Sequence, residues 1–413
     1  MKNKIITVSF LAIIFGVFLA NLVVPDTELS FGERRKLAQL PEFSVERIFN
    51  AKYMDDFDKY TTDQFIGREF FRRVKTFVDK NAFLKLDTNG LFHAQNSIFS
   101  IEYPLREDKV AYMCQRLNAL YDRYLSDMNV YYSIVPDKNY YLPDNGSYLI
   151  MDYRKLETLM ARDMPKQAKY IDLFDTLTLD NYYCSDGHWR QETLAPVVSA
   201  LYEAMGNSQV FDPTQYDYSR YTPFYGVYYG QLAGMADPDT LIWLENQVTR
   251  DAQVTTLGRP GQKDSPVSYS LYKSNDDYSY DEYLDDVQPL IDWDESVPFL
   301  LEDASRVALH GDLPVYYQDG LGGMDSYDVY LYGAQPLIFL DNPHNSSGRE
   351  LIIFRDSYGS SLAPLLLEGY SRITLVDLRY ITQELLSAFI SFDNQDVLCM
   401  FSTTIINNSD IVR

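Results

Sequence analysis

Two short polar stretches of the chain hold the residue types that acyl-transfer chemistry needs. Asp186, Gly187 and His188 lie in "YYCSDGHWRQ", and Ser357 lies far downstream in "IIFRDSYGSS", directly after an apolar run. A serine hydroxyl becomes a good nucleophile when an imidazole removes its proton, and the imidazole works best when a carboxylate fixes its tautomer. The two stretches together contain one such set of groups.

A purely structural interpretation of these residues remains open. Ser and Asp are favoured helix caps, so Ser357 or Asp356 could simply start a helix, and Asp186 could cap another with His188 on the surface. In the functional interpretation, Gly187 lets the backbone turn so that the acid and the histidine converge. Backbone N–H groups after the serine could then receive an oxyanion. The residues alone do not decide between these interpretations.

The segments around both stretches alternate between apolar runs and amphipathic helices. Strands are expected at "NVYYSIVP" (129–136), "ELIIF" (350–354), "RITLVDL" (372–378) and "DVLCMF" (396–401), with a hairpin at 90–99. Helices are expected over 108–128, 190–205, 358–368 and 382–390. This alternation predicts an α/β body with a parallel sheet sandwiched by helices, and ligands of such sheets bind beyond the carboxyl ends of the strands, where Ser357 should lie.

The first 25 residues have the pattern of a membrane anchor. Lys2 and Lys4 precede residues 5–24, which carry no charge and would span roughly 30 Å as a helix. A cleaved signal peptide is the alternative. Since lysines favour the cytoplasmic side, we expect a single-pass cell-membrane protein with its body on the extracellular side.

The remainder of the chain divides by composition. Residues 26–90 are expected to form a polar stalk with one or two helices, and residues 91–413 an α/β domain with an insertion at about 235–310. Within it, residues 274–305 contain eleven acidic residues and no lysine or arginine. A calcium site is conceivable there, but no D-x-D-x-D-G loop is present, and a solvated acidic insertion is the expectation.

The net charge and the cysteines exclude several function classes. A formal net charge of −23 repels nucleic acid, so nucleic acid is not an expected partner. Cys114, Cys184 and Cys399 form neither a disulfide framework nor a metal-binding pattern, and Cys114 has the spacing of a buried thiol. No cofactor and no metal ion are expected.

The motifs also carry a resemblance to a known family. "SDGHWR" followed by "IFRDSYGSSLAPLL" and "ITLVDLRY" resembles the DHHW family of Gram-positive bacteria and, more distantly, the periplasmic SGNH-type O-acetyltransferases of alginate biosynthesis. "ELSFGERRKLAQLPEFS", "DQFIGREFFR", "IVPDKNYY", "FYGVYYGQLAG" and "YLYGAQPLI" extend the similarity over most of the chain. The resemblance implies an SGNH-hydrolase-like fold in which His188 is the general base, Asp186 its orienting carboxylate and Ser357 the nucleophile.

The chain departs from the family pattern at three points. Gly187 stands where the family name has a histidine, and Arg355 replaces the glycine of the usual G-D-S block, where a bulky side chain could alter the turn or cover the site. The asparagine of the SGNH oxyanion hole is unassigned, and Gln335 is a candidate for its role.

Further residues are candidates for substrate contacts. Lys138 follows an expected strand and could meet an anionic or acyl group at the same sheet edge. Tyr228 and Tyr229, together with Tyr225, could form a platform for sugar rings. Trp189 and Arg355 complete this set.

These observations predict a membrane-anchored extracellular O-acyltransferase that acetylates a cell-surface or wall polysaccharide through an acyl-serine. The resemblance implies a multispanning membrane-bound O-acyltransferase as the partner that delivers acetyl groups. One alternative is a carbohydrate esterase with the same triad. The other is a non-catalytic glycan-binding or scaffold protein of a polymer-export complex, and Arg355 is the feature that favours this second alternative.

Overall fold

The computed structural model describes most of the chain. The described residues are 2–30, 33, 35–43, 52–143, 148–232, 236–257, 309–323, 325–333 and 335–413. The acidic run expected at 274–305 lies outside them, as does most of the insertion expected at about 235–310.

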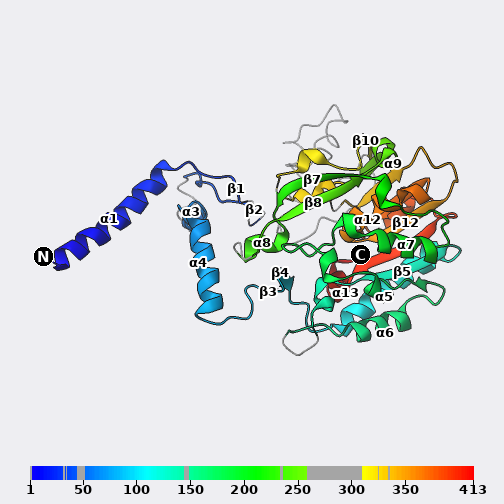
Figure 1. Ribbon diagram of the computed structural model, residues 1–413, viewed down its shortest axis with the longest axis horizontal. Coiled ribbons are helices and arrows are strands. Elements are labelled where there is room, and N and C mark those ends of the chain that lie inside the picture. Colours follow the sequence, from blue (N-terminus) through cyan, green and yellow to red (C-terminus); the bar gives the residue numbers. More distant parts are fainter. Residues whose placement is uncertain are drawn as a thin grey trace.

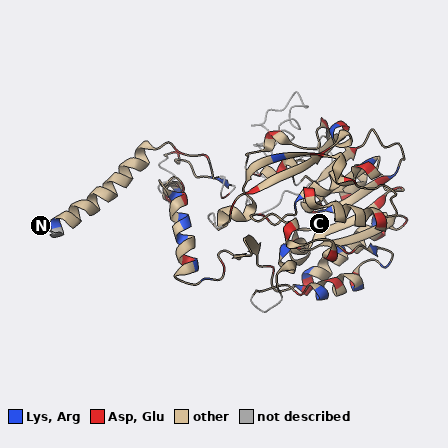
Figure 2. Ribbon diagram, viewed as in Figure 1, with Lys and Arg blue, Asp and Glu red and all other residues tan. Residues whose placement is uncertain are grey.

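The N-terminal part consists of helices that lie to one side of a globular body (Figure 1). Its elements are α1 (Lys2–Val23), the short strands β1 (Leu29–Ser30) and β2 (Arg35–Lys36), and the helices α3 (Lys52–Asp63) and α4 (Arg68–Asn81). Within the described residues, α1 is the one helix long and apolar enough to cross a membrane, and an N-terminal signal sequence would show the same features. Figure 2 shows basic residues along the ribbon of α4. Helices α3 and α4 lie in the segment 26–90, for which one or two helices were expected.

An eight-stranded mixed sheet organises the body. Its order is β10-β9-β11-β13-β12-β14-β5-β6. The strands are β5 (Asn129–Val135), β6 (Lys169–Tyr170), β9 (Gln253–Leu257), β10 (Leu309–Leu313), β11 (Leu337–Asp341), β12 (Glu350–Arg355), β13 (Arg372–Val376) and β14 (Asp396–Ser402).

The expectation of a parallel sheet is correct for five of these strands. β13, β12, β14, β5 and β6 run parallel, whereas β11, β9 and β10 add to one edge as antiparallel strands. A parallel arrangement of consecutive strands needs a crossover of about a dozen residues or more. The segment 342–349 between β11 and β12 is shorter than that, so the chain returns in the opposite direction.

Alternate side chains of the central strands enter two hydrophobic layers. In β12, Leu351 and Ile353 belong to one buried cluster, and Ile352 and Phe354 belong to the other. This alternation follows from the two-residue period of a strand. Each face of the sheet is therefore apolar and must be covered.

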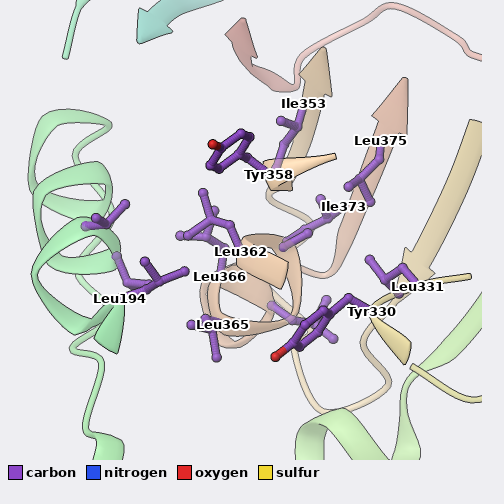
Figure 3. Packing of buried hydrophobic residues seen from close by; sticks show 14 of the residues in the cluster. Leu194, Tyr330, Leu331, Ile353, Tyr358, Leu362, Leu365, Leu366, Ile373 and Leu375 are labelled. Atoms are coloured by element: carbon purple, nitrogen blue, oxygen red, sulfur yellow. The ribbon is translucent and has the colours of Figure 1, made fainter. Parts of the chain in front are cut away.

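Helices cover both faces. α5 (Glu107–Leu120) and α6 (Tyr153–Asp163) supply residues to one cluster, and α7 (Ala195–Ala204) and α12 (Tyr358–Leu366) supply residues to the other. Figure 3 shows Leu362 and Leu366 of α12 between Leu194, which precedes α7, and Ile353 and Ile373 of the sheet. The sandwich expected from the sequence is present.

Three expected helices are shorter than their apolar patterns suggest. Residues 191–193 form a 3-10 turn before α7, residues 121–125 form a π turn after α5, and residues 383–388 form only a 3-10 turn. 3-10 turns are common at helix ends and as connectors, whereas a π turn is a rarer single-turn form.

Two antiparallel hairpins and a short helix accompany the loop 182–191 that carries Asp186 and His188. The hairpin expected at 90–99 is present as β3 (Leu91–Ala94) and β4 (Ser97–Ser100), and β7 (Asp217–Phe224) pairs with β8 (Asp239–Glu245). Between β7 and β8 lies α8 (Val227–Gln231). The N–H of Ile98 in β4 donates to the carbonyl of Cys184 at 2.8 Å, so the first hairpin touches the loop.

Candidate active site

Ser357 lies in the turn between strand β12 and helix α12. Its side chain makes no capping hydrogen bond to α12. The cap is Asp356 instead, since its Oδ1 accepts from the N–H of Tyr358 at 3.1 Å and its Oδ2 accepts from the N–H of Ser402 at 2.7 Å. Because Ser402 ends the neighbouring strand β14, Asp356 also ties the two strand ends together. This capping leaves the Ser357 hydroxyl available for another partner.

That partner is His188. Its Nε2 lies 2.7 Å from Ser357 Oγ, although the two residues are 169 positions apart in the sequence. Its Nδ1 lies 2.6 Å from Asp186 Oδ1. A carboxylate on Nδ1 fixes the proton there, so Nε2 presents its lone pair to the serine hydroxyl. The geometry is that of a nucleophile, a base and an orienting acid.

Asp186 is buried, and both of its carboxylate oxygens accept hydrogen bonds. Its Oδ1 also accepts from the backbone N–H of His188 at 2.9 Å, and its Oδ2 accepts from the N–H of Val227 at 2.8 Å. Val227 is the first residue of α8, so the acid lies at that short helix's N-terminal end. These bonds hold the carboxylate in its position next to Nδ1 of the imidazole.

The loop that carries the acid and the histidine is closed on itself. Tyr182 and Trp189 form an antiparallel bridge, and the N–H of Tyr183 donates to the carbonyl of His188 at 3.1 Å. Asp239, at the start of β8, accepts from the N–H groups of Cys184 and Ser185 at 2.9 and 2.7 Å. A side chain from a distant strand therefore fixes the turn, a contribution that the sequence pattern did not reveal.

Lys138 stabilises the same loop by hydrogen bonds to its backbone carbonyls. Its buried Nζ donates to Ser97 Oγ and to the carbonyls of Tyr183, Cys184 and Asp186, at 2.8 to 3.3 Å. Burial lowers the pKa of Lys138 to about 8. Loop carbonyls surround this ammonium, and Lys138 also lines a small polar pocket, so its contact with an anionic or acyl group stays a prediction.

Aromatic rings pack around the imidazole. Tyr327 stacks on His188 with ring centroids 4.0 Å apart and an interplanar angle of 15°. Tyr358 lies 4.9 Å from His188 and donates its hydroxyl to the carbonyl of Gly187 at 2.6 Å. The sequence did not single out Tyr327, because one tyrosine among 35 carries no positional signal.

Arg355 is completely buried and does not lie over the serine. Its guanidinium donates to the carbonyls of Gly333 and Asp356 at 3.2 and 3.3 Å, and it lies 3.8 Å from the carboxylate of Asp377. Arg379 also pairs with Asp377, at 2.6 Å. The concern that Arg355 covers the site is therefore not supported, and a substrate contact is excluded by its burial in this conformation.

Trp189 and Gln335 are also buried. Trp189 Nε1 donates to Ser361 Oγ at 2.9 Å and its ring meets Tyr358 edge-on. The side-chain amide of Gln335 donates to the carbonyl of Tyr332 at 2.8 Å. Both side chains stabilise the surroundings of the site, and neither has the exposure that the expected substrate contact requires.

The tyrosines of the α8 region separate into two kinds. Tyr225 and Tyr229 form a partly exposed ring pair with centroids 4.6 Å apart. Tyr228 points inward, because its ring lies 5.4 Å from Lys138 Nζ and its hydroxyl lies close to Gly187. Of the three tyrosines suggested as a sugar platform, Tyr225 and Tyr229 therefore form the exposed ring pair, and Tyr228 lines the polar pocket beside Gly187.

A polar pocket lies beside the loop. It is small, with about 20 Å³ of internal space, enough for a water-sized group. Its lining residues are Ser100, Glu102, Asp137, Lys138, Asn139, Gly187, Tyr228, Tyr358 and Thr404. Burial and the nearby Asp137 carboxylate raise the pKa of Glu102 to about 7. In the part of the chain that the structure describes, no group of three His, Cys, Asp or Glu side chains could hold a metal ion.

Comparison with known proteins locates this arrangement among solved folds. No protein-family model matches the chain, and no curated protein sequence matches it significantly. A DHHW family protein from Eubacterium siraeum is 20% identical over 79% of this chain and 97% of its own, with a TM-score of 0.52.

Two other solved structures are more divergent. Bacillus cereus PatB1 with a sulfonyl adduct is 13% identical over 76% of this chain and 97% of its own, with a TM-score of 0.51. The O-acetyltransferase domain of Pseudomonas putida AlgJ is 11% identical over 77% of this chain and 92% of its own, with a TM-score of 0.40. The chain thus has the fold of a DHHW family protein and of PatB1, as its motifs implied.

Proposed function

We propose that this protein is a serine-dependent O-acyltransferase with Ser357 as the nucleophile, His188 as the general base and Asp186 as the orienting acid. The observation that carries the proposal is the unbroken hydrogen-bonded chain from Ser357 Oγ to His188 Nε2 and from His188 Nδ1 to Asp186, at 2.7 and 2.6 Å. A capping role does not explain it, since Asp356 performs the capping at this turn.

The reaction would proceed in two halves. His188 takes the hydroxyl proton while Ser357 Oγ attacks the acyl carbonyl, and the imidazolium then returns that proton to the leaving group as its bond to the acyl carbon breaks. In the second half, His188 deprotonates an acceptor hydroxyl, which attacks the acyl-serine and releases Ser357 with its proton restored. Asp186 stabilises the imidazolium in both halves.

The acceptor we propose is a cell-surface or wall polysaccharide. The partly exposed Tyr225 and Tyr229 rings suit the apolar faces of sugars. The small polar pocket beside Gly187 is lined by hydroxyl and carboxyl groups, which suit a single hydroxyl group of a sugar. An anchor at residues 5–24 would hold the enzyme at the membrane on the extracellular side, where a multispanning O-acyltransferase is the proposed source of acetyl groups. The acetyl transfer itself is suggested by the O-acetyltransferase resemblance of the motifs.

Labelling with a sulfonyl fluoride tests the nucleophile. PatB1 was captured with a sulfonyl adduct, and such reagents react with activated serines. We expect the intact protein to gain one sulfonyl group, and Ser357→Ala and His188→Ala to gain none. Asp186→Asn should react about 10³–10⁴-fold more slowly, because the imidazole tautomer is no longer fixed. Ser208→Ala, which removes an exposed serine elsewhere, is the matched control. Equal labelling of Ser357→Ala and the wild type would refute the proposal.

The acetyl content of the cell-surface polymer distinguishes transfer from the alternatives. A strain that carries Ser357→Ala should show less polymer acetylation if the protein is a transferase. A rise in acetylation would identify an esterase with the same triad. No change in any polymer, combined with no sulfonyl labelling, would identify a non-catalytic glycan-binding or scaffold protein.

A further inference from the structure

Helix α4 exposes an apolar stripe that nothing in the described structure covers. Phe70, Val74 and Phe77 recur at helical spacing, and Phe70 and Phe77 are 63% and 64% exposed. Phe71, beside them, is 55% exposed. Large apolar side chains grouped in this way on a surface usually mark an interaction site. We call Phe70, Val74 and Phe77 the α4 stripe.

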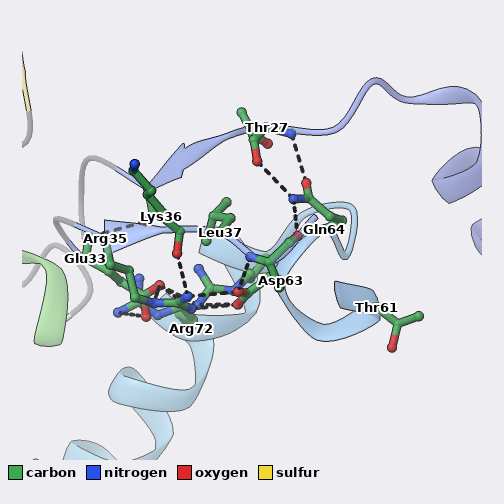
Figure 4. Close-up of polar contacts among 12 residues, drawn as sticks. Thr27, Glu33, Arg35, Lys36, Leu37, Thr61, Asp63, Gln64 and Arg72 are labelled. Atoms are coloured by element: carbon green, nitrogen blue, oxygen red, sulfur yellow. Dashed lines mark hydrogen bonds and ion pairs between the residues drawn. The ribbon is translucent and has the colours of Figure 1, made fainter. Parts of the chain in front are cut away.

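The opposite face of α4 is held by the protein itself. Arg68 pairs with Glu33 at 2.5 Å, and Arg72 pairs with the same carboxylate at 3.3 Å. Figure 4 shows this charged cluster around Glu33, Arg35, Asp63 and Arg72. The two buried residues of the helix, Thr76 and Asp79, are also polar. α4 therefore turns its polar face to the chain and its apolar face away from it, the reverse of a helix on a soluble core.

The position of α4 relative to α1 identifies what covers the stripe. The N–H of Ile66, just before α4, donates to the side chain of Asn21 near the end of α1 at 2.7 Å. The side-chain amide of Gln64 accepts a hydrogen bond from the N–H of Thr27 and donates one to the carbonyl of Thr27, each at 2.9 Å. Figure 1 shows α4 running across the direction of α1. If α1 spans a bilayer, α4 starts at the level where α1 leaves it.

The charge of α4 fits the same location. The helix contains five basic and two acidic residues in a chain whose formal net charge is −23. Figure 2 shows the basic residues as bands along the helix. A helix with phenylalanines on one face and basic residues on the flanks is typical of segments that lie in the interface of anionic membranes.

We propose that α4 is an interfacial helix, with the α4 stripe inserted among the lipids of the leaflet next to the exit of α1. The proposal rests on α1 as a retained anchor and is independent of the acyltransferase chemistry. Phe83, Leu84 and Leu86 follow α4 and are also highly exposed. Two attachments, α1 and α4, would then fix the orientation of the protein on the membrane.

Helix α4 is connected to the candidate site by hydrogen bonds through α8. Arg72 of α4 donates a hydrogen bond to the carbonyl of Gly230 in α8. The N–H of Val227, which begins α8, donates to Asp186. The membrane-bound helix is therefore joined through two hydrogen bonds and one helix to the loop that carries His188. It would set the height and the direction at which the site faces the surface.

Lipid-dependent quenching tests the proposal in the full chain. Phe77→Trp is reconstituted in vesicles of phosphatidylcholine and phosphatidylglycerol with or without bromine on the acyl chains, and the signal of the wild-type tryptophans is subtracted. Lys75→Trp is the matched control, because Lys75 lies on the polar side of α4 with a side chain that is 69% exposed. We expect bromolipids to quench the tryptophan at position 77 at least twofold more than the one at position 75.

Each other outcome overturns the proposal. Equal quenching at the two positions, or none at position 77, means that lipid does not cover the stripe. Shielding of position 77 without bromine quenching, together with Phe77→Cys disulfide dimers, would show that a second copy covers it. Flotation of the wild type with the vesicles verifies that the protein is attached to them through its retained anchor. Sulfonyl labelling of Phe77→Trp at the wild-type rate would show that the substitution leaves the candidate active site unchanged, so the two proposals are tested separately.

Discussion

The Tyr228 hydroxyl fills the space that any side chain at position 187 would need. A Cβ on Gly187 would lie 2.7 Å from Tyr228 Oη and 3.3 Å from Cζ. Tyr228 itself is confined, because its ring lies beside the buried Lys138 ammonium. The glycine that stands in place of the family's histidine is thus matched by a tyrosine from α8.

Substitution at this position should therefore disturb the loop. We expect Gly187→Ala to be less stable than the wild type and to react more slowly with the sulfonyl fluoride, because His188 moves with the turn. In Gly187→Ala/Tyr228→Phe, the hydroxyl is absent and the new methyl group has more room. The double variant should therefore be more stable, by about 0.5–3 kcal/mol, than the sum of the two single-variant effects predicts. Denaturant unfolding of the four proteins measures it. Additive effects would show that the two residues do not compete for space.

Tyr327 should control the reactivity of His188 through its ring and not through its hydroxyl. Tyr327→Leu removes the face that stacks on the imidazole at 4.0 Å, so we expect slower labelling of Ser357. Tyr327→Phe keeps the ring and loses the hydrogen bond to Ser361 Oγ at 2.9 Å. Its labelling rate should match the wild type, with a loss of about 1 kcal/mol in the free energy of unfolding. Equal labelling rates for the leucine and phenylalanine variants would contradict this role.

Arg355 should matter for stability and not for reactivity. Arg355→Ala leaves a cavity beneath α12, and such losses cost about 2–5 kcal/mol. Arg355→Met keeps the volume, and Asp377 retains its bond to Arg379, so the methionine variant should be close to the wild type in stability. Both folded variants should label at Ser357 at the wild-type rate. A change in that rate in Arg355→Met would show that the guanidinium acts on the site.

Lys138 predicts a pH dependence of stability. Burial lowers its pKa from 10.5 to about 8 in the folded protein. Between pH 8 and 10.5 the unfolded chain then binds more protons at this residue, so its contribution to the free energy of unfolding rises with pH. We expect Lys138→Met to lack this rise, whereas Lys75→Met, at an exposed lysine, should keep it. Identical slopes for the wild type and Lys138→Met in chemical denaturation would refute the assignment.

Local pattern was sufficient for the elements that carry the candidate site. The apolar run 350–354 became β12, and α12 begins at Tyr358 as expected, because strand and helix periodicities are set within a few residues. The same holds for β5, β13, β14 and the first hairpin. The pattern was insufficient at residues 383–388, where a helical spacing produced only a 3-10 turn.

Local sequence was enough to identify a serine after a strand, an acid and a histidine in one loop, and a long apolar N-terminal segment. Tertiary packing was needed to show that His188 reaches Ser357, that Asp356 is the cap, and that Lys138 and Arg355 are buried. The reason is physical. Caps, turns and periodicities depend on neighbours a few residues away, whereas a 2.7 Å contact between residues 169 positions apart depends on the packing of the sheet, α8 and α12 together.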